Sequence, residues 1–353
     1  MFFHRLMTGL LLFYALGANI DAREHIHHGF AIESFFSPFH FVMYAGWFSV
    51  GVALAACAAL QFRRGKPRSE WLPPGYWASA VGFAIFGSGG GFDIVWHEIF
   101  GFEANMEAPL SPAHMVLIAG SVFMYLGVLL HSLHLRGESP HRFIATINGC
   151  NLPMILSISL ILQSTLWPTW YFDPFVVDYA SGGIVAGQFD AFSFIEFGTA
   201  AAEVAGVSGI LLLSLATTPF LILPLYLWRL PLGTVAIVFG YFYASRMFSA
   251  GTYIYLPAVI GASVVAELLW FGIRRRGEGG LSNRTGYRLM ALLFPLVLYS
   301  IYFTIIATRA NGIVWSPHIW VGALAYAGIA GIMMSFVALR PAFYHVRVGL
   351  PDA

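Results

Sequence analysis

Ten long apolar segments, separated by short polar gaps, make up most of this 353-residue chain. A helix that crosses a bilayer needs roughly 20 predominantly apolar residues, and the segments have about that length. The expected segments are 6–21, 38–60, 76–96, 112–133, 143–166, 200–228, 232–249, 253–273, 288–308 and 316–339. Only 10% of the residues are charged, whereas a soluble domain carries about 25%. We therefore expect an all-α fold, a polytopic integral membrane helix bundle built from helical hairpins.

The polar gaps are too short to hold a separate soluble domain, so residues 1–353 are expected to form a single transmembrane domain in contact with the lipid bilayer. The net charge of +1 gives no indication of nucleic-acid binding. The first segment has the charged start and short apolar run of a signal peptide. No clear small-x-small cleavage site precedes Asp21, which favours an uncleaved membrane helix.

The charges of the gaps alternate along the chain and predict a topology. Basic residues follow every second segment: Arg63, Arg64, Lys66 and Arg68; Arg136 and Arg142; Arg229; Arg274 to Arg276; Arg340 and Arg347. The opposite gaps carry acidic residues instead. Because basic loops stay in the cytoplasm, both termini are expected to be cytoplasmic and the acidic gaps to face outward. The expected location is a bacterial inner membrane.

Two outer hairpins carry the same order of potential metal ligands. A carboxylate is followed four residues later by a histidine, and then by a second histidine after a Ser-Pro pair. The two sets are Asp21, His25 and His40, and Asp93, His97 and His114. Positions i and i+4 share one helix face, and a Ser-Pro pair suits the N-cap and first position of the returning helix. Three ligands are therefore expected to converge across each hairpin.

This combination of ligands indicates a metal site at each hairpin. Two imidazoles and a carboxylate suit copper, zinc or iron, and ionisable groups at a membrane boundary are costly unless they are paired, solvated or bound. His27 and His28 are alternative ligands in the first set. Helix capping without a metal is the competing explanation, and we prefer it for His318, which follows Pro317 without a preceding Asp-x-x-x-His. Haem ligation is a further alternative.

The second set resembles a known family. Asp93-Ile-Val-Trp-His97 with Ser111-Pro112-Ala113-His114 is similar to the Asp-x-x-x-His and Ser/Thr-Pro-x-His of the C subunit of copper-dependent membrane monooxygenases, the particulate methane and ammonia monooxygenase family. The first set corresponds to that subunit's second set, with Asp21 where the family has Asn. The resemblance implies a copper site and oxidation of a small apolar substrate by a monooxygenase or one of its subunits.

The chain also departs from that family. The spacing between His97 and His114 is longer, there are more helices, and Glu103-Ala-Asn-Met-Glu107 replaces an Arg-Asp-Thr stretch. An oxidoreductase would need other membrane subunits and an electron donor, because this chain has no soluble redox domain. The same ligands fit a membrane copper carrier, and the aromatic outer gap at 168–197 fits a non-catalytic subunit of a larger membrane complex, with a loop lying on the membrane. A haem-binding subunit would use His97 and His114 or His40 as axial ligands.

One further charge lies within an expected membrane segment. Arg246 falls in the seventh segment, where a charged side chain needs a partner. Such a charge is a candidate functional residue by default, and a structural pair with Glu196 or Glu203 explains it equally well.

Overall fold

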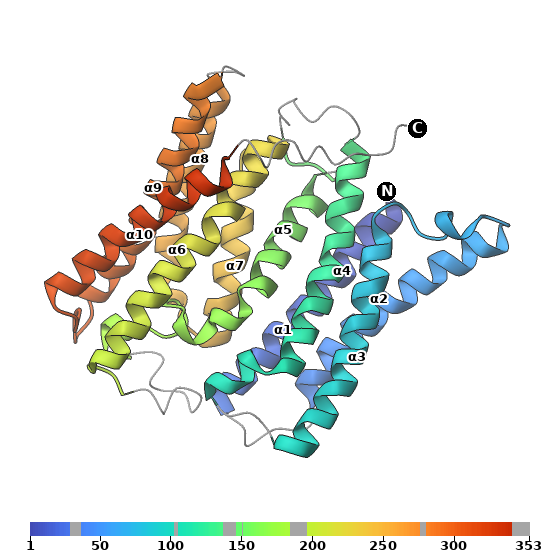
Figure 1. Cartoon of the computed structure of the whole chain (residues 1–353), viewed down its shortest axis with the longest axis horizontal. Helices are drawn as coiled ribbons and strands as arrows, with labels where there is room; N and C mark the ends of the chain where they lie inside the picture. Colours follow the sequence, from blue (N-terminus) through green and yellow to red (C-terminus); the bar gives the residue numbers. More distant parts are fainter. Residues whose placement is uncertain are drawn as a thin grey trace.

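The computed structural model describes residues 1–28, 37–101, 105–136, 146–149, 151–183, 196–275 and 280–340. These residues form ten α-helices and no strand (Figure 1). The helices are α1 (Phe2–His28), α2 (Pro38–Arg63), α3 (Tyr76–Phe100), α4 (Pro112–Arg136), α5 (Leu152–Thr165), α6 (Ala200–Trp228), α7 (Thr234–Ala250), α8 (Leu256–Arg275), α9 (Gly280–Ala307) and α10 (Pro317–Ala338). Short 3₁₀ helices are η2 (Arg68–Glu70), η3 (Asn105–Leu110), η4 (Trp167–Phe172), η5 (Tyr179–Ser181) and η8 (Tyr253–Tyr255). The expected all-α bundle is confirmed.

Seven of these helices are long and apolar enough to cross a membrane: α2, α3, α4, α6, α8, α9 and α10. The others differ for identifiable reasons. Helices α5 and α7 have 14 and 17 residues and bury most of their side chains inside the bundle, where they need not face lipid. Helix α1 has 27 residues and carries Asp21, Arg23 and Glu24 towards its end. The molecule is therefore an integral membrane helix bundle.

Close contacts between helices fix the first two hairpins. A Cβ atom on Gly46 of α2 would collide with the backbone of Tyr14 on α1. In the same way, a Cβ atom on Gly82 of α3 would collide with the backbone of Met124 on α4. Small residues at such crossings let two helix backbones approach and pack tightly within a membrane. Each hairpin therefore holds its two helix ends at a fixed separation, where the predicted ligands lie.

The buried apolar residues form two clusters. The smaller cluster lies mainly among α1 to α4 and includes Met7, Val50 and Met124. The larger cluster lies mainly among α5 to α10 and includes Phe239 and Trp270. Figure 1 shows α5 between these two groups of helices. Helix α5 contributes residues to both clusters and so connects the first four helices to the last five.

Helix α5 begins later than the expected start at residue 143. Asn148 and Asn151 form a closed turn just before it, in which each backbone N–H donates to the other side-chain carbonyl oxygen at 2.9 and 3.2 Å. Proline is well tolerated only in the first turn of a helix, and Pro153 lies in that turn. Among the described residues 146–149 and 151, this turn stands where hydrophobicity alone predicted helix.

The chain after α5 packs into the bundle instead of lying on the membrane surface. Phe175, Val176 and Val177 are fully buried. Arg246 of α7 forms a buried ion pair with Asp173, with 2.9 Å between Nη1 and Oδ2. Pairing of Arg246 with Glu196 or Glu203, one of the two explanations that the sequence left open, is therefore wrong, because the folded loop brings the carboxylate of Asp173 to Arg246. Residues 184–195 of the expected loop lie outside the described residues.

Candidate metal centre

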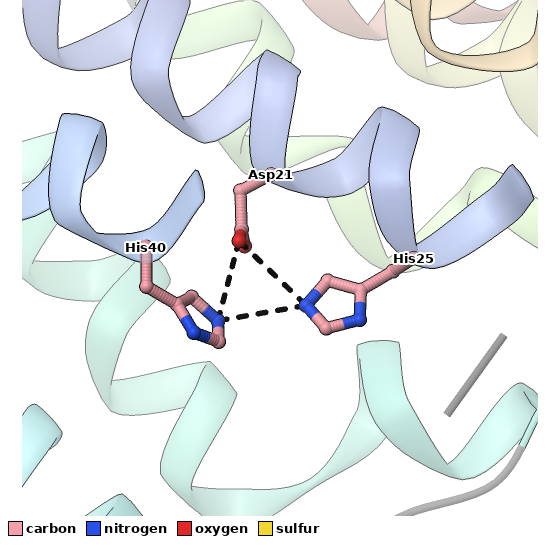
Figure 2. Close-up of side chains that lie close together, drawn as sticks. All are labelled: Asp21, His25 and His40. Atoms are coloured by element: carbon pink, nitrogen blue, oxygen red, sulfur yellow. Dashed lines mark hydrogen bonds and ion pairs between the residues drawn. The ribbon is translucent and has the colours of Figure 1, made fainter. Parts of the chain in front are cut away.

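The first predicted set of ligands comes together at the open end of the α1–α2 hairpin. Asp21 and His25 lie one turn apart on α1, and His40 lies in the first turn of α2, all pointing toward one another (Figure 2). The Asp21 Oδ1 atom lies 3.7 Å from His25 Nε2 and 3.3 Å from His40 Nε2. The two Nε2 atoms are 3.5 Å apart. Three ligand atoms therefore surround one point.

The Ser-Pro pair positions His40 as the sequence predicted. Ser37 is the N-cap of α2 and has an extended backbone conformation, and its hydroxyl accepts a hydrogen bond from the His40 N–H at 3.1 Å. Pro38 follows as the first helical residue. A capped first turn has a defined backbone geometry, so the His40 ring has a fixed starting position beside α1. The first triad contains neither His27 nor His28, and His28 lies 3.3 Å from Glu24 instead.

The second set converges at the equivalent end of the α3–α4 hairpin. Asp93 Oδ1 lies 3.4 Å from His97 Nε2 and 3.9 Å from His114 Nε2. The three ligand atoms lie within 4.8 Å of one another, and Asp93 is buried. Ser111 accepts a hydrogen bond from the His114 N–H at 3.2 Å, which repeats the capping geometry of the first hairpin.

Hydrogen bonds define the orientation of both imidazoles in the second triad. His114 Nδ1 lies 2.6 Å from the Ala108 carbonyl oxygen, and His97 Nδ1 lies 3.1 Å from the Gly101 carbonyl oxygen. A carbonyl oxygen only accepts, so these contacts place a proton on each Nδ1. In a neutral imidazole, Nε2 then carries a lone pair. Both lone pairs face the carboxylate of Asp93, an arrangement that a cation between them would stabilise.

Both triads line one cavity, with a volume of about 210 Å³. Its walls come from α1 to α5, η3 and η4. Apart from the two triads, the described residues that line it are uncharged. The sequence predicted two separate sites, and the packing of the two hairpins joins them into one centre.

Two aromatic residues beside the triads were not predicted as part of the site. Tyr44 stacks on the His40 ring, with 5.9 Å between ring centres and 18° between planes, and lies within electrostatic range of Asp21 and Asp93. Tyr44 lies four residues after His40, on the same helix face, and this spacing is the sequence signal that would have indicated its place beside the triad. Trp167 of η4 lies 5.9 Å from the His114 ring and lines the cavity. No spacing rule relates Trp167 to the triads.

The segment that holds Trp167 is anchored from the other half of the molecule. The Arg246 guanidinium donates to the Leu166 carbonyl oxygen and pairs with Asp173, so it holds both ends of η4. Tyr171 of η4 also lines the cavity. Burial raises the pKa of Tyr171 to about 12, so its phenol stays protonated and uncharged. Helix α7 therefore fixes one wall of the cavity without contributing a ligand.

The third Ser-Pro-His sequence forms no such cluster. His318 is exposed in the first turn of α10, and Ser316 is the N-cap. The described residues contain two groups of three or more histidine, cysteine or acidic residues arranged to hold a metal, and His318 belongs to neither. The sequence Ser316-Pro317 therefore begins a helix here, as the capping interpretation predicts, although the Ser316 side chain makes no capping hydrogen bond.

No family model, curated protein or solved structure matches the chain. The resemblance to the C subunit of the copper membrane monooxygenases therefore stays a prediction, and the site is interpreted from its own geometry.

Proposed function

We propose that this protein binds two copper ions, one at each triad, and oxidises a small, uncharged and largely apolar substrate. The observation that carries this proposal is the single cavity lined by all six ligands. Two ions bound there would face the same substrate. We further propose that this centre lies at the outer side of a bacterial inner membrane, with both termini in the cytoplasm, because the basic gaps lie at the opposite helix ends.

The ligand geometry favours a metal ion over hydrogen bonding among the side chains. In the first triad, Asp21 Oδ1 is buried and accepts no hydrogen bond from the described residues, although two histidine nitrogens face it. Two Nε2–H groups could in principle both donate to one carboxylate oxygen, but the 3.7 Å between His25 Nε2 and Asp21 Oδ1 is too long for a hydrogen bond. A metal ion binds all three at once, and it satisfies the lone pairs that His97 and His114 direct at Asp93.

Copper is the proposed ion because of the resemblance of the Asp93 set to the copper membrane monooxygenases. Imidazole and carboxylate ligands also suit zinc and iron, so the metal analysis below covers all three. Copper, when bound, would supply the one-electron redox chemistry. The protein's own residues hold the six ligands in place and surround the substrate with uncharged walls. Electrons would come from a partner protein or a membrane-soluble donor.

Two alternatives are less well supported by the geometry. A copper carrier needs ligands along a path to the other side, whereas both ligand groups among the described residues lie at one end of the bundle. A haem needs its axial histidines on opposite faces of the macrocycle. Here one oxygen of Asp93 lies within 3.9 Å of both His97 Nε2 and His114 Nε2, which fits a single ion.

Metal analysis of the protein purified in detergent tests this function. The wild-type protein is expected to bind two copper ions per chain. Asp93→Ala and Asp21→Ala should each bind one, and the double variant should bind none, because a removed carboxylate leaves only two ligands. His318→Ala is the matched control and should keep both ions, since His318 starts a helix after the same Ser-Pro pair but lies outside both triads.

Two results would contradict the proposal. One is a folded wild-type protein that binds no copper, zinc or iron after incubation with each metal. The other is a pair of triad variants that remain folded by circular dichroism and keep two ions. Binding of zinc alone would retain the metal site but remove copper oxidation. Copper uptake into vesicles would favour the carrier function.

A further inference from the structure

Gly90 of α3 is a glycine that helix packing does not explain. A glycine inside a helix is less favourable than alanine, and for Gly82, Gly89, Gly120 and Gly127 of this hairpin a close contact with the other helix accounts for it. A Cβ on Gly89, for example, would touch Leu117 of α4. A Cβ on Gly90 would meet no atom within 4 Å. The absence of a side chain at this position therefore leaves space open.

That open space belongs to the metal cavity. Gly90 lies three residues before Asp93 and seven before His97, so the three share one face of α3, and all of them line the cavity. A ligand held at the second triad and extending toward the middle of the membrane would pass directly over Gly90. The next residue, Gly91, also has nothing within 4 Å of a Cβ, but it is exposed and does not line the cavity.

The neighbouring walls at this level are aromatic and apolar. A Cβ on Gly87 would touch Trp47 of α2, so α2 and α3 are in contact one turn below Gly90. Because α2 and α3 run antiparallel, three residues onward on α3 correspond to three residues back on α2, which places Tyr44 level with Gly90. Phe86 of α3 and Met43 of α2 also line the cavity. Apart from the triads, the described residues that line the cavity offer no charged side chain to a ligand.

We propose that Gly90 determines the size of the ligand that the second triad accepts, and that the space beside it receives the alkyl or aryl group of an uncharged ligand. This inference rests on the proposed metal site and deepens it, because it names a specificity-determining residue and a class of ligand. The ligand's polar atom faces the metal ion, and its apolar part lies between α2 and α3 over Gly90.

The test uses the copper-loaded full-length protein and two probes of different size. Azide is a small copper ligand, and 4-phenylimidazole is an uncharged ligand with an aryl group. Binding is followed by the change in copper absorbance. Gly90→Leu is expected to weaken 4-phenylimidazole binding by about tenfold or more, because the leucine side chain occupies the space of the phenyl ring. Azide affinity should stay within about twofold of wild type, and Gly90→Ala should give a smaller effect of the same kind.

Gly91→Leu is the matched control, since it adds the same side chain one residue away on the exposed face. It should leave the affinity for both probes within about twofold of wild type. Equal affinity of the wild-type protein and Gly90→Leu for 4-phenylimidazole would overturn the inference. It would also be overturned if Gly90→Leu and Gly90→Ala each lost azide affinity and 4-phenylimidazole affinity to the same extent. A wild-type protein without copper would instead overturn the proposed function, so the two failures are distinguishable.

Discussion

Individual hydrogen bonds prepare the histidines of the second triad for a metal ion. Ala108 and Gly101 offer backbone carbonyl oxygens to the Nδ1 atoms of His114 and His97, which leaves each Nε2 facing Asp93. Ser111 adds a contact of 2.9 Å to His114 Nδ1 and caps the helix. Partners of this kind orient a ligand and increase its basicity. The metal affinity that we propose for this site should therefore depend on residues that would not touch the metal.

Replacing Ser111 by alanine tests this dependence. We expect Ser111→Ala to lower copper affinity at the second triad about tenfold, because the His114 ring loses one of its orienting contacts. Loss of the cap should also cost about 1 kcal/mol of unfolding free energy. Competition with a copper chelator measures the first effect, and thermal unfolding measures the second.

Ser316→Ala is the control for that experiment. Ser316 is the N-cap of α10 and precedes Pro317 and His318, but its side chain makes no capping hydrogen bond. This variant should change neither the copper affinity nor the stability appreciably. Equal copper affinities in Ser111→Ala and the wild-type protein would show that Ser111 does not orient His114.

At this scale, the sequence predicted much of the site. The i, i+4 spacing and the Ser-Pro pairs correctly indicated which atoms meet within each hairpin, because both are local features of helix geometry. Trp167 and Gly90 could not be found in that way. Their roles depend on which helices lie beside them in space, and no local spacing in the sequence records that arrangement.

Whole helices act as pairs, and each hairpin supports its own triad. Gly46 holds α2 against α1, and Gly82 holds α3 against α4. Because the ligands of a triad are divided between the two helices of one hairpin, the distance between those helices sets the distance between the ligands. Damage to one hairpin should therefore affect one metal ion.

Glycine substitutions provide a test at this scale. Gly82→Leu should reduce copper at the Asp93 triad and spare the Asp21 triad, whereas Gly46→Leu should do the reverse. Each added side chain meets a helix backbone and should cost about 1–3 kcal/mol of unfolding free energy. Metal analysis of each variant in the Asp21→Ala and Asp93→Ala backgrounds shows which ion is lost.

Gly9→Leu is the control, because Gly9 is exposed and a Cβ there meets nothing within 4 Å. It should retain both ions. If Gly46→Leu and Gly82→Leu each lower the copper content of both triads equally, the hairpins do not support the triads independently.

The buried ion pair between Arg246 and Asp173 is a second contact between elements, because it connects α7 to η4. Replacing Arg246 by leucine leaves an uncompensated buried carboxylate and should cost about 3–5 kcal/mol of unfolding free energy. The double variant Arg246→Leu/Asp173→Leu should recover most of that loss, because no isolated charge remains. Unfolding by denaturant in detergent measures both.

The exposed pair of Lys66 with Glu70, 2.9 Å apart, is the comparison for that measurement. Lys66→Ala should change the unfolding free energy by less than about 1 kcal/mol, as is usual for exposed ion pairs. If Arg246→Leu costs as little as Lys66→Ala, the buried pair does not anchor η4.

The sequence predicted the positions of the helices better than their lengths and burial. Hydrophobicity located all ten helices, since long apolar runs in a membrane protein form helices. It did not show that α5 and α7 are short and central, because a buried helix and a lipid-facing helix are equally apolar. The sequence also did not indicate Asp173 as the partner of Arg246, because the packed loop that carries Asp173 has no periodic pattern.

Across the whole molecule, metal binding and stability should be coupled. Each ion binds the folded protein through residues that come together only on folding, so at a free copper concentration of 100 times Kd each site adds about 2.7 kcal/mol. Removing copper with a chelator should lower the thermal midpoint. The double variant Asp21→Ala/Asp93→Ala should be insensitive to copper and chelator.

Acid should have the same effect as the chelator. Histidine binds a metal only when neutral, so metal binding releases protons and metal affinity decreases as the pH falls. The stabilisation by copper is therefore greatest at neutral pH and decreases on acidification, because protons compete with the metal for the imidazole nitrogens. Thermal midpoints with and without copper from pH 8 to 5 measure this. A copper-dependent shift that is unchanged at pH 5 would contradict histidine ligation.

All six ligands lie on α1 to α4, whereas the guanidinium that secures the cavity wall lies on α7. A chain is synthesised from its N-terminus, and early parts fold first. Both triads therefore emerge from the ribosome before the Arg246 anchor of η4 exists. During that interval the cavity would lack one fixed wall, so the order of synthesis would give the proposed metal ions a period of easier entry before the last five helices complete the bundle.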